Sequence, residues 1–200
     1  MTIPFPDHGA QEEIIRKIGK AELLFKRGRK ILRFEKVTYG DVDRDRPCYG
    51  LLKPYARGRV LNVGLGMANS ADLILSQSGV TALVTYELEQ DIADVYAAEV
   101  TPDPRHTVIV ADAHSNKPTG DFDVVLFELE VSRQDLYDKA KTYIRWAANH
   151  LASGGHVILK WSRVAECLAN EFSAQATITI LSQSTGRKPR PKWIVLERSQ

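Results

Sequence analysis

RVLNVGLGMA, residues 59–68, joins an apolar run directly to a glycine-rich turn. The run at 59–64 is typical of a buried strand, and a helical pattern follows the turn at residues 69–78. Glycine allows a tight turn and a close ligand approach, because no Cβ stands in the way. The N–H groups of the next helix would face such a ligand. This stretch therefore predicts the opening strand, turn and helix of a ligand-binding α/β sheet.

The same alternation continues toward the C-terminus. Uninterrupted apolar strands separated by helices indicate a parallel sheet that is covered on both faces. The last two apolar runs, ATITILSQS and KWIVLERS, have only GRKPRP between them and predict an antiparallel hairpin. The expected strands are 81–87, 107–112, 122–128 and 156–161, and the expected helices are 89–99, 134–152 (ending at Gly154-Gly155) and 163–172.

The N-terminal part has a different pattern. Apolar residues recur at helical spacing over residues 10–27, so we expect an amphipathic helix that ends at Gly28. Residues 30–39 alternate and predict a strand or short hairpin, and Pro47 can begin a short helix. We therefore expect residues 1–57 to be a helix and strand extension of a main domain at 58–200.

Candidate site residues follow the predicted strands. Gly64, Gly66 and Met67 belong to the turn, and Glu87 ends the second strand 23 residues after Gly64. A carboxylate at that place can accept hydrogen bonds from both hydroxyls of a ribose. After the third strand, Asp112-Ala113 offers an acceptor for an adenine amino group and room for the ring.

Residues 58–161 resemble the core of the class I S-adenosylmethionine-dependent methyltransferases. RVLNVGLGMA is similar to their first motif, VTYELE to the second, VIVADA to the third and FDVVLFE to the fourth. The resemblance implies a Rossmann-like α/β sheet, mostly parallel with a C-terminal antiparallel hairpin. It also implies S-adenosylmethionine as the cofactor and methyl transfer as the reaction.

Within this superfamily, GRVLNVGLGMA and FDVVLFELE are similar to guanidinoacetate-type N-methyltransferases. Two positions depart from the pattern. Asn62 replaces the acidic residue that is common two positions before the first glycine, and its side-chain carbonyl can still accept from the methionine amino group. Glu128 replaces the Asp that ends the fourth strand in the guanidino enzymes. Glu128 and Glu130 share a direction along that strand, so we expect them to be the catalytic carboxylates that orient an acceptor.

Two other families share features with the chain. GGHVILKW places Lys160 on the fifth strand, much as RNA 2′-O-ribose methyltransferases place a catalytic lysine, although such a lysine can also simply reach solvent. The spermidine synthases share the sheet, an N-terminal strand extension like residues 30–39 and cationic substrates. An aminopropyltransferase-like or non-catalytic adenosyl-binding protein is therefore an alternative, as is the RNA enzyme.

Charge is distributed unevenly, although the net charge is only +2. Residues 16–36 hold nine Lys or Arg against two Glu, whereas residues 87–138 hold thirteen Asp or Glu against three Lys or Arg. These segments are either solvated faces or an acidic site rim framed by basic edges. An acidic rim favours a cationic acceptor, so we expect a small-molecule or amine-type acceptor. Nucleic acid would use 16–36 and 187–192.

The remaining composition predicts a cytoplasmic protein without a membrane partner. Cys48 and Cys167 form no CxxC pair, which fits a reducing compartment. The N-terminus has no signal-like apolar run, and no segment approaches the roughly 20 apolar residues of a membrane span. The five histidines show no metal-ligand spacing, so we expect no metal site.

Overall fold

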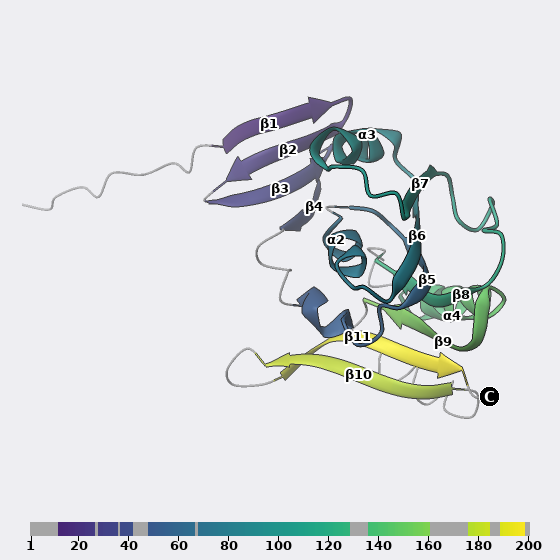
Figure 1. Ribbon diagram of the computed structural model, residues 1–200. Helices are drawn as coiled ribbons and strands as arrows, with labels where there is room; N and C mark the ends of the chain where they lie inside the picture. Colours follow the sequence, from purple (N-terminus) through teal and green to yellow (C-terminus); the bar gives the residue numbers. More distant parts are fainter. Residues whose placement is uncertain are drawn as a thin grey trace, which may run out of the picture.

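The computed structural model describes residues 12–26, 28–35, 37–41, 48–66, 68–128, 136–160, 176–184 and 189–198. Its larger sheet has seven strands in the spatial order β10-β11-β9-β8-β5-β6-β7 (Figure 1). The five strands β5 to β9 pair in parallel, and β11 is antiparallel to both β9 and β10. The predicted α/β fold is thus confirmed. The strands are β5 (Gly58–Val63), β6 (Val80–Glu87), β7 (His106–Val110), β8 (Phe122–Phe127), β9 (Leu151–Leu159), β10 (Ala176–Ser184) and β11 (Pro189–Arg198).

Helices cover both faces of this sheet. Helices α2 (Asn69–Leu75) and α3 (Gln90–Glu99) lie on one face, and α4 (Leu136–Ala148) lies on the other. Successive strand residues point to opposite faces, so Val60 packs into the core under α2 while its neighbour Leu61 packs into the core under α4. Strands that are buried on both faces explain the uninterrupted apolar runs. None of the helices in the described part of the chain is long and apolar enough to span a membrane.

The predicted helix over residues 10–27 is wrong. Instead, β1 (Glu12–Ile18), β2 (Ala21–Lys26), β3 (Arg29–Phe34) and β4 (Val37–Asp41) form an antiparallel sheet in that order. Gly19 adopts a φ of +50° in the tight turn between β1 and β2, where a helical residue would have a negative φ. Ile14 and Ile15, which the helix would have buried, are 51% and 42% exposed. β-Branched residues favour strands, and here that preference prevailed.

The N-terminal sheet packs on α3 (Figure 1). Leu23 and Leu32 lie in one buried cluster with Ile92 and Val95 of the helix. At the tip of the first hairpin, the backbone N–H of Lys20 donates to the Asp91 carboxylate at 2.7 Å. Apolar burial and this polar contact together attach the extension beside the start of α3.

Two predicted boundaries differ in the structure. Helix α4 ends at Ala148, and β9 already begins at Leu151, so Gly154 and Gly155 lie within the strand. The pairing of β8 with β9 slips there, from Phe122↔Leu151 to Val124↔His156, so the glycines mark a bulge and not a helix end. The predicted helix at 163–172 lies outside the described residues. The short helix near Pro47 corresponds to the 3-10 turn η1 (Gly50–Leu52).

Candidate active site

The glycine turn follows the carboxyl end of β5, and both of its glycines have a positive φ. Gly64 and Gly66 have φ values of +99° and +48°, and Ala68 also lies in the left-handed region at +58°. The N–H of Gly64 donates to the carbonyl of Tyr86 at 2.8 Å, which fixes the turn against β6. Apart from its chain neighbours, no described residue has an atom within 4 Å of a Cβ placed on Gly66. Among the described residues, the space above the turn is therefore open, and a ligand can approach the backbone there. Met67 lies outside the described residues.

Glu87 ends β6 and points its carboxylate back at this turn. Its Oε2 accepts hydrogen bonds from the backbone N–H groups of Leu65 at 2.9 Å and Gly66 at 3.4 Å. Its Oε1 accepts from the N–H of Glu89 at 3.1 Å. A carboxylate has about four acceptor positions, so capacity remains for a ribose hydroxyl. Glu87, which is 8% exposed, thus shapes the turn whether or not it also binds a ribose.

Asn62 ties the turn to the following helix. Its fully buried side chain donates from Nδ2 to the Gly64 carbonyl at 2.9 Å and to Ser70 Oγ at 3.3 Å. Among the residues that the structure describes, its Oδ1 has no hydrogen-bond partner. Oδ1 is the atom expected to accept from the methionine amino group, and that role stays a prediction.

Asp112 and Ala113 lie beyond β7, which ends at Val110. The Asp112 carboxylate accepts from the backbone N–H of His114 and from Ser115 Oγ, each at 3.0 Å, and so stabilises the loop. Ala113 is buried in the core beneath α4. Their expected contacts with adenine stay predictions, because the side-chain contacts seen here are made within the loop and the core.

Glu128 directly follows β8 and borders the turn. Its N–H donates to the Val63 carbonyl at 3.0 Å, and its Cβ lies 3.6 Å from the position of a Cβ on Gly64. The structure therefore brings Gly64, Glu87 and Glu128 together at one edge of the sheet. Glu130, the second expected catalytic carboxylate, lies outside the described residues.

Tyr49 joins this edge from the segment that precedes β5. Its hydroxyl donates to Glu128 Oε2 at 3.4 Å, and Lys160 Nζ donates to the same hydroxyl at 2.9 Å. From the sequence alone, the Lys160 ammonium could have been either catalytic or simply solvent-facing. In the structure it contacts the Tyr49 side chain. Nothing in the sequence pointed to Tyr49, because the contacts span 79 and 111 residues.

A cavity of about 260 Å³ lies between the N-terminal sheet and the helices α2 and α3, and Gly66 reaches its wall. Its lining is apolar where Leu23, Leu32 and Val95 contribute, and charged where Lys30 faces Glu99. The site edge is consequently bordered by the extension as well as by the main sheet.

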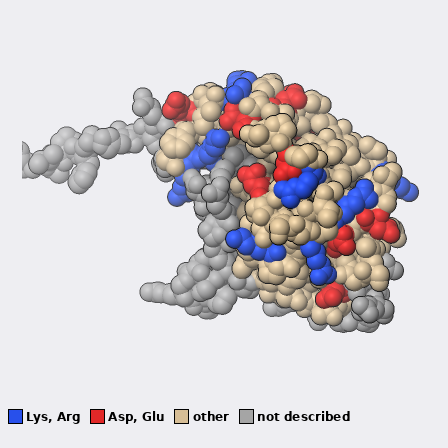
Figure 2. Space-filling model, viewed as in Figure 1, with Lys and Arg blue, Asp and Glu red and all other residues tan. Residues whose placement is uncertain are grey.

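The basic residues of the N-terminal sheet are largely paired. Within the described part of residues 16–36, at least six Lys and Arg form ion pairs with carboxylates. In the space-filling view, Lys and Arg lie beside Asp and Glu and do not merge into a single basic stripe (Figure 2). The pairs are Arg16–Glu99, Lys17–Glu22, Lys20–Glu35, Lys26–Glu12, Lys30–Glu99, and Arg33 with both Glu12 and Glu22.

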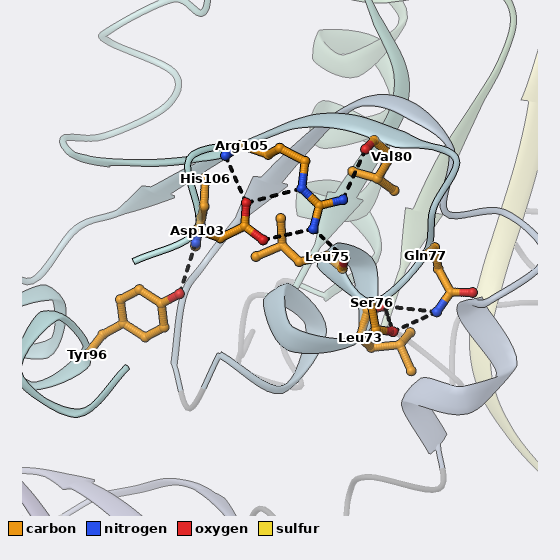
Figure 3. Close-up of polar contacts among 9 residues, drawn as sticks. All are labelled: Leu73, Leu75, Ser76, Gln77, Val80, Tyr96, Asp103, Arg105 and His106. Carbon is orange, nitrogen blue, oxygen red and sulfur yellow. Dashed lines mark hydrogen bonds and ion pairs between the residues drawn. The ribbon is translucent and has the colours of Figure 1, made fainter. Parts of the chain in front are cut away.

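The opposite end of the sheet is braced by Arg105 (Figure 3). Its guanidinium donates to the carbonyls of Leu75 at 2.6 Å and Val80 at 3.3 Å, so it satisfies backbone acceptors at the end of α2 and the start of β6. The same group contacts Asp103 at 2.7 Å, and these hydrogen bonds lower the pKa of Asp103 to about 2.

His106 lies next to this brace, with its ring nitrogen facing the Tyr96 hydroxyl (Figure 3). Its Nε2 is 2.8 Å from Thr85 Oγ1, and its Nδ1 is 2.9 Å from the Tyr96 hydroxyl. Burial lowers the pKa of His106, because the imidazolium would lose its hydration. The neutral ring serves as a link between β6, β7 and α3.

Comparison with known proteins supports the fold but supplies no sequence relative. No family model and no curated protein matches the chain. Spermidine synthase from Thermotoga maritima matches 90% of this chain and 69% of its own, with a TM-score of 0.67 and 11% identity. A Klebsiella pneumoniae protein assigned as an O-methyltransferase matches 78% of this chain and 80% of its own, with a TM-score of 0.56 and 16% identity.

An rRNA methylase from Streptococcus thermophilus matches 77% of this chain and 95% of its own, with a TM-score of 0.54 and 9% identity. At such low identities these likenesses concern the fold alone. The chain therefore has the Rossmann-like fold of class I methyltransferases, which spermidine synthase also shares.

Proposed function

We propose that the chain binds S-adenosylmethionine at the carboxyl edge of its large sheet and transfers the methyl group to a nitrogen of a small acceptor. The observation that carries this proposal is the placement of Glu128 against Gly64, so that a carboxylate borders the open glycine turn. Open α/β sheets bind ligands at this edge, where the strand order reverses around the central strand.

The residues present fit the cofactor. The part of the cofactor that lies against the protein backbone would pass over Gly64 and Gly66. Asn62 Oδ1 would accept from the amino group of the cofactor, and the remaining lone pairs of the Glu87 carboxylate would accept from the ribose. Asp112 would offer an acceptor for the adenine amino group. When bound, S-adenosylmethionine supplies a methyl group that the sulfonium already activates for in-line displacement.

The chain's own residues then have two tasks, alignment and proton removal. An amine acceptor must present a neutral lone pair, so a carboxylate must orient it and receive or stabilise its proton. Glu128, which borders the glycine turn, would perform this task. In the described part of the N-terminal sheet, carboxylates lie beside the Lys and Arg side chains and partly neutralise them, which supports a small acceptor over a phosphate backbone.

Aminopropyl transfer is a second candidate, and one observation favours it. The likeness to spermidine synthase extends over 90% of the chain, whereas the likeness to the two methyltransferase-type structures covers 77% and 78%. Both candidates use an adenosyl sulfonium and a nitrogen acceptor. They differ in the donor and in the by-product.

The test is a transfer assay with methyl-labelled S-adenosylmethionine, run against monoamines, diamines, guanidinoacetate, a phenol and total RNA. We expect label in an amine together with S-adenosylhomocysteine. A parallel assay supplies decarboxylated S-adenosylmethionine with the same amines, and release of methylthioadenosine there would instead establish aminopropyl transfer. Label confined to RNA in the first assay would overturn the small-molecule proposal.

A matched pair of variants links turnover to Glu128. Glu128→Gln keeps the volume and removes the charge, so we expect near-normal cofactor affinity and a loss of turnover of roughly 100-fold or more. Glu197→Gln makes the same chemical change on an exposed part of β11 and should leave turnover intact. Equal turnover in both variants would remove Glu128 from the mechanism.

A further inference from the structure

Three side chains from distant parts of the chain form one line of hydrogen bonds at the site edge. Lys160 Nζ lies 2.9 Å from the Tyr49 hydroxyl, which lies 3.4 Å from Glu128 Oε2. Lys160 Nζ is also 5.1 Å from the centre of the Tyr49 ring, so the ammonium interacts with both the hydroxyl and the ring face.

The chemistry of the lysine determines which atom donates and which accepts in each of these hydrogen bonds. An ammonium has three donors and no acceptor, so the Tyr49 oxygen accepts from Lys160. A phenol has a single proton, and that proton is then directed to Glu128. Each hydrogen bond polarises the next, so the carboxylate receives a donor that the positive charge behind it has strengthened.

The ring of Tyr49 is buried and packs against Trp193. Its side chain belongs to a residue that is 4% exposed, and its ring packs edge-on against Trp193 at 5.3 Å. The Trp193 indole N–H donates to the carbonyl of Cys48 at 2.8 Å and so anchors the backbone beside Tyr49. The phenol therefore has one position relative to β9 and β11.

We propose that Tyr49 and Lys160 are positioning residues that act on the acceptor only through Glu128, an inference that rests on the proposed function of Glu128. They hold its carboxylate in one orientation beside the glycine turn. Lys160 has no direct proton transfer with the acceptor. This distinguishes it from a catalytic lysine that deprotonates a hydroxyl, although both kinds of lysine would be sensitive to substitution.

A double-mutant cycle measured on turnover separates these two roles. Tyr49→Phe keeps the ring, and Lys160→Met keeps most of the side-chain volume. We expect each to lower kcat roughly 10-fold, with cofactor affinity and thermal stability near normal. In the Tyr49→Phe background, Lys160→Met should cost no more than about 3-fold, because its route to Glu128 is already broken. Lys160→Arg keeps a donor and should recover most of the activity.

Lys53→Met and Tyr55→Phe serve as matched controls and should leave kcat unchanged. Lys53 is exposed, and Tyr55 packs its ring against His156 away from Glu128. The assay uses the acceptor found with labelled S-adenosylmethionine. Should Lys160→Met cost as much in the Tyr49→Phe background as in the parent, Lys160 acts independently of Tyr49 and the proposal is overturned.

A second measurement needs no acceptor. In protein labelled with 3-fluorotyrosine, the ¹⁹F resonance absent from Tyr49→Phe identifies this phenol. It should shift in both Lys160→Met and Glu128→Gln but not in Lys53→Met. If this resonance does not shift in either variant, the hydrogen bonds that link Lys160, Tyr49 and Glu128 do not form and the proposal is overturned. If the resonance responds while the parent transfers nothing to any acceptor, the proposed function fails and the line is only structural.

Discussion

The Glu87 carboxylate accepts a hydrogen bond from the backbone N–H of Leu65 at 2.9 Å, so the end of one strand shapes the turn that leaves its neighbour. Charge-assisted hydrogen bonds of this kind are among the stronger ones in proteins. The residue expected to bind a ribose is therefore also a structural member of the turn, and its substitution should affect both properties.

Glu87→Ala should weaken binding of S-adenosylhomocysteine by an amount on the order of 1.5–3 kcal/mol, because the turn loses its charged acceptor. Glu87→Gln should lose less, since its one amide oxygen can still accept from Leu65. Isothermal titration calorimetry gives both values, and unfolding in urea reports the structural part separately. Unchanged affinity in both variants would show that the cofactor binds elsewhere.

Gly66→Val should abolish the thermal shift that S-adenosylhomocysteine produces in the parent. The new side chain would enter the open space above the turn, where no described residue other than the chain neighbours of Gly66 comes within 4 Å. A ligand that binds only the native state raises its stability, so loss of binding removes the shift.

Gly28→Val provides the control for backbone strain. Gly28 also has a positive φ, +76°, and a Cβ added there would meet no atom within 4 Å, but it lies in the turn before β3. Both variants should lose stability of about 1–2 kcal/mol from the left-handed backbone, whereas only Gly66→Val should lose the ligand response. A normal response in Gly66→Val contradicts the assignment of the turn.

Asp103→Asn should make the protein less stable at neutral pH and flatten its acid dependence. The native pKa of about 2 lies below the ordinary value of 3.8, so the stabilisation is present above pH 3.8 and is lost as the pH falls toward 2. Urea unfolding at several pH values measures this. Asp138→Asn makes the same chemical change at an 86% exposed side chain on α4 and should have a smaller effect on stability at neutral pH.

His106 should make stability depend on pH in a less acidic range than Asp103 does. Its lowered native pKa means that the unfolded chain binds the proton first, so stability decreases as the pH falls below about 6.5. His106→Gln should reduce that decrease, while His150 and His156, whose pKa values burial also lowers, sustain the rest. At pH 8 the variant and the parent differ only through packing and hydrogen bonds. An identical slope from pH 7 to 5 would show that His106 titrates normally.

The large sheet was predictable from the sequence because its signals are local. Apolar runs with glycine or helical patterns between them indicate parallel strands wherever they occur, and the carboxyl-end rule then brings Gly64, Glu87 and Glu128 together. The proposed chemistry of these residues required only their order along the chain and the parallel direction of the strands.

The parts that the sequence did not predict depend on contacts between distant segments. Residues 12–26 have apolar residues at helical spacing, but they form a hairpin that both the β-branched isoleucines and the packing on α3 favour. Tyr49 reaches Glu128 and Lys160 across 79 and 111 residues, so no local pattern marks it. The sequence likewise did not predict that Glu87 accepts hydrogen bonds from the turn, because a carboxylate at a strand end gives the same sequence pattern whether it faces a ligand or backbone amides.

The docking of the N-terminal sheet on α3 determines how the chain can be divided. Ile92 and Val95 are 1% and 4% exposed, and their burial comes in part from Leu23 and Leu32. A fragment that begins at residue 58 would present these apolar side chains to water next to Glu89, which contacts Glu87. The fragment would still contain all strands of the large sheet, but α3, next to the edge with the glycine turn, would no longer be covered by the N-terminal sheet. Excision at residue 57 should thus yield an aggregation-prone fragment with a loosened glycine turn.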